Sequence, residues 1–500
     1  MDINQEMNGM GRLNLPICKR IVNNDISQDF TLPDYYPEIR RVLYVKETML
    51  PVAKFISGNK LDVNGVVDYS LVYVSNEGKL CSAPMTSEYA FSVGMDNIGD
   101  FEMSEGVSVM VHSEAESSTV RVISPRKLQI RSRLRSNVNA WGKKSCAEKI
   151  EGIESPVSLQ RKNESGVCVD VICESSDMVS VEDEYVLPNE SCRVALADSS
   201  VLIDGCKIEG DIVRVNGHIV LKMLIINDED DSCERVSRKM DFEAESDLGG
   251  IDFTSDIYCR VDGCVTDMTL NVEEGKVLID ANLALEICMT QNKNISYTSD
   301  VYSTEQTAEV FSVEEFLPTV IENRNINFSQ SERIELSELG FQKEAEIVDV
   351  SAKALVDECN SEYGRYVIKG DCRYNIICRS NGEYSVCEAR APFRYEADSE
   401  DLVDTFDVSV DVLNSRARSD GEYINLDAEL CMGCTLMGRE GARILQSATF
   451  GEKREQNGSE WTVYYIQDGE NMWDIAKRYG VSQNEVKGNV EKDRFVLIQK

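Results

Sequence analysis

Histidine is scarce in this chain of 500 residues, which contains only His112 and His218. Two histidines cannot supply a multi-histidine metal site, and they leave few candidates for the general base that many enzymes use. Each lies in a strand-like run, where we interpret it as an ordinary sheet residue. The composition therefore points away from enzymes before any motif is considered.

Long apolar runs are also missing. The most apolar stretch, residues 219–226, is interrupted by Lys222 and is far shorter than the roughly 20 residues that cross a bilayer. The first residues, Met1-Asp2-Ile3-Asn4-Gln5-Glu6, lack the basic and apolar regions of a secretory signal. We expect a soluble, intracellular protein without a membrane span.

Metal-ligand spacing is nearly absent although the chain has 17 cysteines. The one Cys-x-x-Cys is Cys431-Met432-Gly433-Cys434, and no second ligand pair lies near it, whereas zinc normally takes four Cys or His ligands. In a reducing compartment the cysteines are expected to act as small buried apolar residues. We predict no metal and no cofactor.

Positive charge is in short supply. The chain has 52 Lys and Arg against 88 Asp and Glu, a formal charge of −36, which repels nucleic-acid phosphates and anionic lipids. We therefore expect no nucleic-acid partner. Acidic runs such as Glu182-Asp183-Glu184 are weak evidence for a hydrolase in such a chain and are read as solvated surface. A hydrophobic content of 42% still suffices for cores, and the length suggests three or four domains.

An internal repeat organises the chain. Residues 58–75, 210–227 and 364–380 share an alternating apolar pattern around a central glycine, and these glycines are separated by 152 and 153 residues: Gly65, Gly217 and Gly370. The alternation predicts a long strand with one buried face, and the period predicts tandem domains. A glycine in the middle of a strand predicts a bulge or a close backbone approach.

Each copy ends in a predicted hairpin. The paired runs are residues 107–122 with 127–141, 257–270 with 276–289, and 406–418 with 422–436. We predict a mostly β protein with three tandem domains at residues 1–145, 156–292 and 315–450, joined by linkers near 142–155 and 291–314. Copies one and two open at Leu32-Pro33 and Leu187-Pro188, whereas copy three has no proline there and its entry has diverged. No copy repeats an acid, a base and a nucleophile, so we predict no catalytic residues and no enzyme.

The last forty residues differ in character. After a polar linker at residues 451–459, the pattern predicts a strand at 461–466, a helix capped by Asn471 and ended by Gly480, a second helix capped by Ser482 and Glu485, and a final strand at 494–498. The predicted order is βααβ. Residues 460–500 hold 7 acidic and 6 basic residues, a net charge of −1, so the remaining chain carries −35.

This C-terminal pattern closely resembles a LysM domain. The matching residues are Val463, Ile466, Gly469, Trp473, Ile475, Ala476, Tyr479, Gly480, Val481, Asn489, Leu497 and Ile498. The resemblance implies a shallow groove for N-acetylglucosamine-containing glycans between two loops, with these site residues: Asp468, Gly469, Glu470, Asn471, Met472, Trp473, Asn489, Val490 and Arg494. The first turn is Gly469-Glu470-Asn471-Met472 where the family commonly has Gly-Asp-Thr-Leu, and residues 491–494 lack the usual proline and glycine. Both a glycan and a protein partner stay open, and Trp473 is either a core residue or a partly exposed interface anchor.

The three upstream copies resemble the SPOCS domain of clostridial and bacillar spore-envelope proteins. The resemblance is carried by the entries at Pro33 and Pro188, the Val-Asn-Gly strands at Gly65 and Gly217, and the repeated hairpins. Three such units followed by a LysM-like domain resemble the spore-coat proteins that bind the coat morphogenetic ATPase.

The resemblance implies a non-enzymatic scaffold in the mother-cell cytoplasm, at the forespore surface. Its LysM-like domain would tether it to that ATPase, and its SPOCS-like units would self-associate or dock other coat proteins. The alternative, based on the LysM pattern alone, is a peptidoglycan-binding protein.

Overall fold

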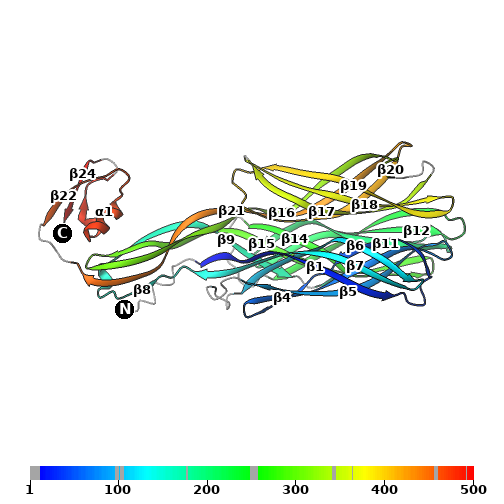
Figure 1. Cartoon of the computed structure of the whole chain (residues 1–500), viewed down its shortest axis with the longest axis horizontal. Coiled ribbons are helices and arrows are strands. Elements are labelled where there is room, and N and C mark those ends of the chain that lie inside the picture. The colour runs from blue at the N-terminus through cyan, green and yellow to red at the C-terminus, as the bar shows by residue number, and fades with distance from the viewer. Residues whose placement is uncertain are drawn as a thin grey trace.

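Antiparallel strands make up most of the computed structural model, which describes residues 12–95, 101, 106–175, 178–247, 257–339, 345–362, 364–454, 460–490 and 493–499. The fold is mostly β, as the alternation predicted, and the described residues contain a single α-helix. Three elongated β units lie side by side, and a small C-terminal unit sits at the far end of a stalk (Figure 1).

Unit 1 is a sandwich of two antiparallel sheets. One sheet has the order β1-β7-β6, and in the other β4 pairs with β5 on one edge and with the consecutive strands β2 and β3 on the other edge. The strands are β1 (Arg12–Thr31), β2 (Ile39–Met49), β3 (Ala53–Ser57), β4 (Lys60–Ser75), β5 (Leu80–Gly94), β6 (Val107–Ser124) and β7 (Lys127–Ser145).

Unit 2 also has two antiparallel sheets, but its split edge strand lies in the sheet of its last strand. The central strand β15 pairs with β14 on one edge and with the consecutive strands β9 and β10 on the other, and the second sheet has the order β11-β12-β13. The strands are β9 (Leu159–Ser175), β10 (Val179–Val186), β11 (Cys192–Glu209), β12 (Ile212–Asn227), β13 (Cys233–Asp247), β14 (Ile257–Glu273) and β15 (Lys276–Ser303).

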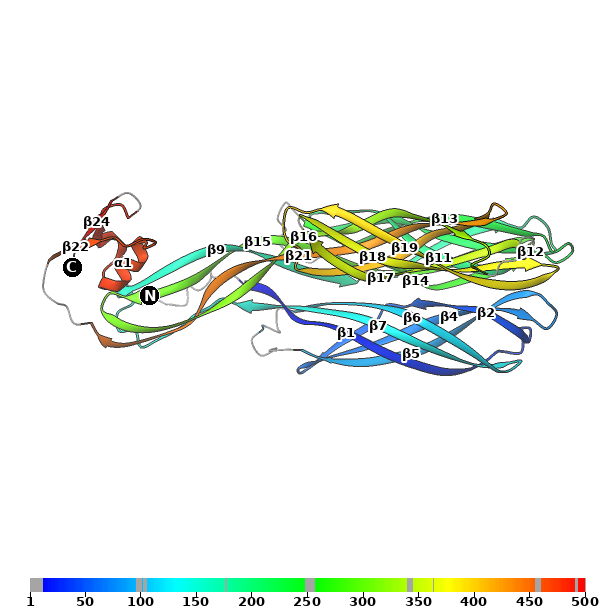
Figure 2. The same cartoon turned by 45° about the horizontal axis from the view of Figure 1, so that its top comes forward.

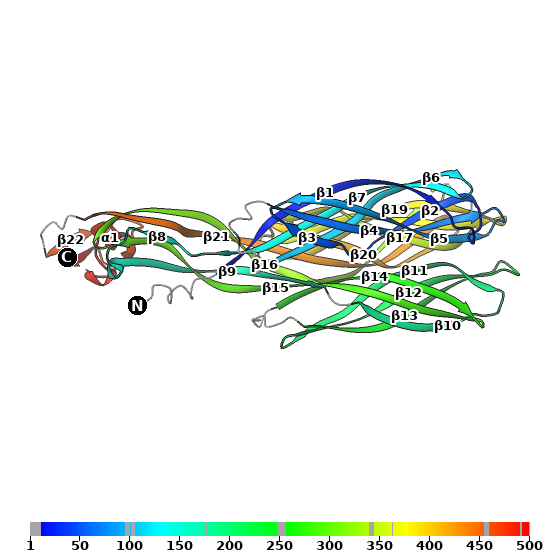
Figure 3. The same cartoon turned by 90° about the horizontal axis from the view of Figure 1, so that it is seen from below.

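Unit 3 has the sheets β16-β21-β20 and β17-β18-β19. Its strands are β16 (Gln306–Glu335), β17 (Glu346–Glu362), β18 (Arg365–Ser380), β19 (Glu383–Asp398), β20 (Thr405–Ser419) and β21 (Tyr423–Lys453). In each unit the last strand (β7, β15 or β21) is the centre of one sheet, and the strands that do not pair with it form the other sheet. The units differ in their edge strands, since one is split into β2 and β3 in unit 1 and another into β9 and β10 in unit 2, whereas those of unit 3 are unbroken. In Figures 2 and 3 the long strands of the three units lie roughly along the same axis, the long axis of the molecule.

Each sandwich has its own core between its two sheets. In unit 3, Ile368, Tyr374 and Ile376 of β18 are fully or almost fully buried against Leu426 and Leu430 of β21. Equivalent cores lie between the sheets of units 1 and 2. The alternation in the sequence therefore correctly indicated which face of each repeat strand is buried.

The three repeat glycines lie where the backbone is approached closely, as expected. Gly65, Gly217 and Gly370 each stand directly opposite an aromatic residue of the next strand, namely Tyr89, Phe242 and Phe393. A Cβ atom on Gly217 would lie 2.9 Å from Cζ of Phe242, and one on Gly370 would lie 2.5 Å from Cζ of Phe393 and closer still to the carbonyl oxygen of Leu355. The ring covers the space that a side chain would fill, so only glycine fits.

The stalk is formed by the ends of the longest strands. Residues of β15 beyond 292 pair with β9, the first part of β16 pairs with the last part of β21, and the short β8 (Lys149–Glu151) joins β21 in parallel. Buried side chains such as Val301, Leu445 and Phe450 fill the space between these layers. The linker expected at residues 291–314 is therefore wrong, because β15 and β16 run through it with a break of two residues only. The linker expected at 142–155 is partly strand as well, since β7 ends at Ser145 and β8 follows.

The units also meet in an apolar cluster. Each unit has a β-bulge at the same repeat position, and the extra residues, Leu43, Ala195 and Val348, are all buried in this cluster. Because a bulge re-aims a side chain, the three bulges direct apolar groups of three sheets to one point.

Candidate binding surface

The C-terminal unit is built on local signals that the sequence made visible. It contains β22 (Trp461–Tyr465), α1 (Met472–Tyr479), a 3-10 turn (Gln483–Glu485), β23 (Val486–Lys487) and β24 (Phe495–Gln499), with the sheet order β22-β24-β23. Asn471 caps α1, since its Oδ1 accepts a hydrogen bond from the backbone N–H of Asp474 at 3.0 Å. Gly480 ends α1 at φ +64°.

The prediction of a second helix in this unit is wrong. The backbone N–H of Ser482 donates to the Glu485 carboxylate at 2.7 Å, as its cap predicts, but the helix stops after one 3-10 turn. Val486 already pairs with Ile498 of β24, so a β-branched residue starts a strand where a helix would have continued. The described order is strand, helix, 3-10 turn, short strand and strand.

The first predicted groove loop is a tight turn with a charged centre. Gly469 takes φ +85°, and Asp468 is exposed. The Glu470 carboxylate accepts from the backbone N–H of Gln467 at 3.0 Å and from the Tyr464 hydroxyl at 2.8 Å, and it pairs with Arg478 at 2.6 Å. These donors, the backbone N–H first, lower the pKa of Glu470. Glu470 therefore braces the loop rather than facing an open site.

Trp473 is a buried docking residue. Only 5% of its surface is exposed. Its ring packs edge to face on the ring of Tyr302 of β15, with the ring centroids 4.8 Å apart, and its Nε1 donates a hydrogen bond to Asp300 Oδ2 at 2.8 Å. Lys477 reaches both oxygens of Asp300 at 2.6 Å, and the Tyr302 hydroxyl donates to the carbonyl oxygen of Val481 at 2.8 Å. Helix α1 is thus bound to the end of the stalk, and Trp473 is a core residue of that contact.

The second predicted loop contributes few outward groups. Val490 and Met472 pack, half-buried, on the core of the unit. Asn489 and Arg494 are exposed, and the backbone N–H of Asn489 donates to Asp493 Oδ2 at 2.7 Å. The carbonyl oxygen of Arg494 accepts from the Ile466 N–H at 3.1 Å, which brings the two loops together, whereas residues 491 and 492 lie outside the described part. The apolar members of the predicted site therefore turn inward and most of its polar members stay at the surface.

The surface that the prediction missed is the outer face of this sheet. Five apolar side chains with 37% to 71% of their area exposed lie on its two main strands: Trp461, Val463, Tyr465, Phe495 and Leu497. Val463 stands opposite Leu497, and Tyr465 stands opposite Phe495 with ring centroids 6.1 Å apart. We call these five residues the outer face. The sequence does carry a signal for this face. A sheet with one solvent-exposed face normally has polar residues on that face, but the exposed positions of β22 are the apolar Trp461, Val463 and Tyr465.

Other candidate chemistry is sparse in the described residues. The sixteen cysteines whose side chains the structure describes form no disulfide, and the described residues contain no group of three or more His, Cys, Asp or Glu side chains placed to hold a metal ion. His218 is buried in β12 with its Nδ1 3.0 Å from Asp204 Oδ2, a contact between neighbouring strands. The one described α-helix has eight residues, too few to span a membrane.

Comparison with known proteins returned nothing: no family model, no curated protein and no solved structure matches this chain.

Proposed function

We propose that this protein is a non-enzymatic adaptor of spore-coat assembly that attaches to a protein partner through the outer face of its C-terminal unit. The partner suggested by the LysM-like and SPOCS-like resemblance is the coat morphogenetic ATPase. The proposed site of action is the mother-cell cytoplasm, at the forespore surface. The three SPOCS-like units would form the scaffold that meets other coat proteins.

The outer face is the observation that carries this proposal. Two of its five exposed apolar side chains are large aromatic rings on one strand, Trp461 and Tyr465, and a third, Phe495, lies beside Tyr465. Exposed apolar patches of this kind mark interaction sites, and Trp and Tyr are enriched among residues that dominate binding energy. The C-terminal unit also has a net charge of only −1 against −35 for the rest, so less charge repulsion opposes contact with an acidic partner there.

The glycan alternative has weaker support. The groove loops present the polar groups of Asp468, Asn489 and Arg494, but Met472, Trp473 and Val490 are turned toward the core and cannot provide an apolar floor for a sugar. Calorimetric titration of the full chain with chitin oligomers tests it directly. Saturable heat from these sugars would favour the peptidoglycan-binding alternative over the adaptor.

The adaptor proposal is tested by capture of the purified ATPase. The full chain and a chain ending at Lys453 are compared on the same immobilised ATPase, with far-ultraviolet circular dichroism to verify that both retain their β structure. We expect capture by the full chain and loss of capture by the shortened one. Equal capture by both would refute the tether.

A further inference from the structure

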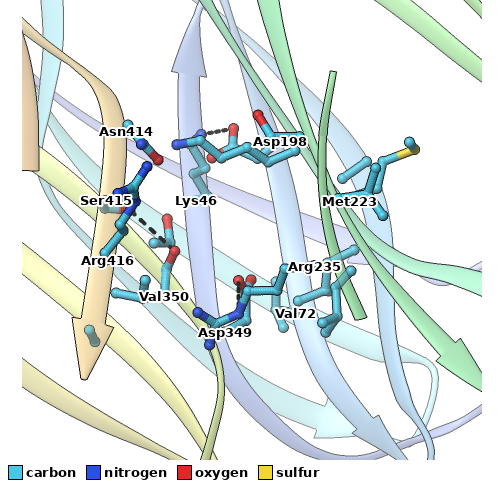
Figure 4. A pocket seen from close by; sticks show the side chains of 18 of the residues that line it. Lys46, Val72, Asp198, Met223, Arg235, Asp349, Val350, Asn414, Ser415 and Arg416 are labelled. Carbon is cyan, nitrogen blue, oxygen red and sulfur yellow. Dashed lines mark hydrogen bonds and ion pairs between the residues drawn. The ribbon is translucent and has the colours of Figure 1, made fainter. Parts of the chain in front are cut away.

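A cavity of about 340 Å³ lies where the three units meet, next to the apolar cluster of the bulge residues. Every unit lines it: β2 and β4 of unit 1, β11 to β13 of unit 2, and β17 and β20 of unit 3. Figure 4 shows polar and charged side chains from these strands directed toward a common space. Its volume is within the range of sites that bind small molecules.

The charges lining this junction cavity are unlike those of the chain as a whole. Five of the lining residues are cationic and two are acidic: Lys46, Lys222, Arg235, Arg416 and Arg418 against Asp198 and Asp349. The lining therefore carries a formal charge of +3 in a protein whose total is −36. A cationic hollow in an acidic protein favours an anion at that place.

Two of the cations are neutralised within the protein. Lys46 forms an ion pair with Asp198. Arg235 Nε lies 3.7 Å from Asp349 Oδ1 and donates a hydrogen bond to the carbonyl oxygen of Val348 at 2.7 Å. These pairs link unit 1 to unit 2 and unit 2 to unit 3.

Three cations remain without a partner. Among the described residues, the side chains of Lys222, Arg416 and Arg418 make no hydrogen bond and no ion pair. Lys222 is half-buried, and burial lowers its pKa although Asp198 opposes this change. An amine withdrawn from water with no acceptor costs free energy, which a bound anion would offset.

At one position of the cavity lining, the repeat itself indicates that a charge is not needed for the fold. Three residues after its buried bulge residue, each unit has a side chain at the same strand position. This residue is Lys46 in unit 1, Asp198 in unit 2 and Ser351 in unit 3. The three copies thus share the apolar bulge residue and differ in the polar one. Uncommitted hydrogen-bonding groups complete the lining, since no hydrogen bond of the Ser70 hydroxyl or the Asn414 amide is found among the described residues.

We propose that the junction cavity binds a small anion that carries at least two negative charges on phosphate or carboxylate groups. Lys222, Arg416 and Arg418 would hold it, with Ser70 and Asn414 donating hydrogen bonds. The occupant would contact all three units and so stabilise their arrangement. This site is separate from the outer face and does not depend on the adaptor function.

The test uses the full chain and two probes, pyrophosphate and citrate, with acetate at matched ionic strength as the reference. Isothermal titration and thermal unfolding are measured for the wild type, Lys222→Gln, Arg416→Gln and the control Lys239→Gln, an exposed lysine of β13 outside the cavity. Arg416 is exposed, so its variant is expected to fold even if Lys222→Gln does not.

We expect saturable binding of at least one probe and a higher unfolding temperature in its presence. Each cavity variant should weaken binding about tenfold, the value of one charged hydrogen bond, while Lys239→Gln should not. Which probe binds distinguishes phosphate from carboxylate. The proposal is overturned if neither probe saturates at about 1 mM, or if Lys239→Gln weakens binding as much as the cavity variants do.

Discussion

The three sandwich units and the C-terminal unit differ in whether the apolar faces of their sheets are covered. In each sandwich, the apolar faces of two sheets cover each other, and further apolar side chains close the junction between units. In the C-terminal unit, α1 covers one face of the sheet and the five residues of the outer face leave the other uncovered. The sheets of the repeats therefore cover each other, although single apolar residues such as Phe311 stay exposed, whereas one face of the C-terminal sheet is mostly apolar and uncovered.

The two regions are nevertheless joined by a specific contact. The core of the C-terminal unit includes Tyr302 of β15, and Asp300 accepts hydrogen bonds from both Trp473 and Lys477. Arg454 adds hydrogen bonds to the carbonyl oxygens of Gln306 and Lys477, at 3.0 and 3.2 Å. The helix side of the unit is therefore used for attachment to the stalk, which directs the outer face away from it.

The largest effect is expected from filling the glycine site of a sandwich unit. In Gly370→Ala the new Cβ would collide with the Leu355 carbonyl oxygen and the Phe393 ring, and we expect a loss of about 3 kcal/mol in the free energy of unfolding. Gly441→Ala is the matched control, because nothing lies within 4 Å of a Cβ there. Urea unfolding measures both, and equal losses would show that close packing at Gly370 is not the cause.

The next effect concerns the contact between the two regions. Asp300→Ala leaves the buried Nε1 of Trp473 without its acceptor, and we expect the contact to weaken by about 2 kcal/mol. Hydrogen exchange of α1 and the end of β15 should rise, while Asp468→Asn, an exposed change in the same unit, should leave it unaltered. Unchanged protection in Asp300→Ala would contradict the docking role of Trp473.

A pH effect is expected at the junction of the three sandwich units. Burial raises the pKa of Asp349 from 3.8 to about 6, only partly opposed by Arg235. Because the folded-state pKa is the higher one, this contribution to stability is present below pH 3.8 and is lost as the pH rises through about 6. Relative to the wild type, Asp349→Asn should therefore gain about 1–2 kcal/mol in the free energy of unfolding as the pH rises from below 3.8 to above about 6, after allowance for partial exposure of the group.

Urea unfolding at several pH values measures this gain. A difference between Asp349→Asn and the wild type that does not change with pH would rule out the ionisation of Asp349 as its source.

The smallest effect is expected on the exposed surface of the repeats. Arg365 and Asp398 form an ion pair at 3.0 Å, but both side chains are mostly exposed. Arg365→Gln should change the free energy of unfolding by less than about 0.5 kcal/mol, since water and salt screen such pairs. A larger loss in thermal unfolding would mean that surface charges contribute more to the repeats than their cores suggest.

Local signals in the sequence predicted much of this structure. The repeat glycines, the alternating strands and the caps at Asn471 and Gly480 depend on neighbours in the chain, and the structure has them where they were expected. The aromatic residues opposite the glycines recur in each copy, so Tyr89, Phe242 and Phe393 could have been found from the repeat itself.

Features that depend on distant partners could not be predicted. The strands of the stalk run through the expected linker at 291–314 because β9 and β21 pair with them, and neither pairing is visible in a single sequence. The burial of Trp473 depends on Asp300, 173 positions away. The outer face was missed because Tyr464 and Tyr465 place aromatic residues in both alternating sets of positions of β22, so periodicity did not say which set faces outward.

The most direct test is the affinity of the full chain for the purified ATPase when one residue of the outer face is changed. Tyr465→Glu places a charge on the outer face, and Phe311→Glu makes a matched change at an exposed aromatic residue of β16, since their exposed fractions are 71% and 61%. We predict that Tyr465→Glu weakens binding by at least about thirtyfold with unaltered thermal unfolding, and that Phe311→Glu binds like the wild type. Wild-type affinity in Tyr465→Glu, or equal losses in both variants, would contradict the assignment of the outer face as the binding surface.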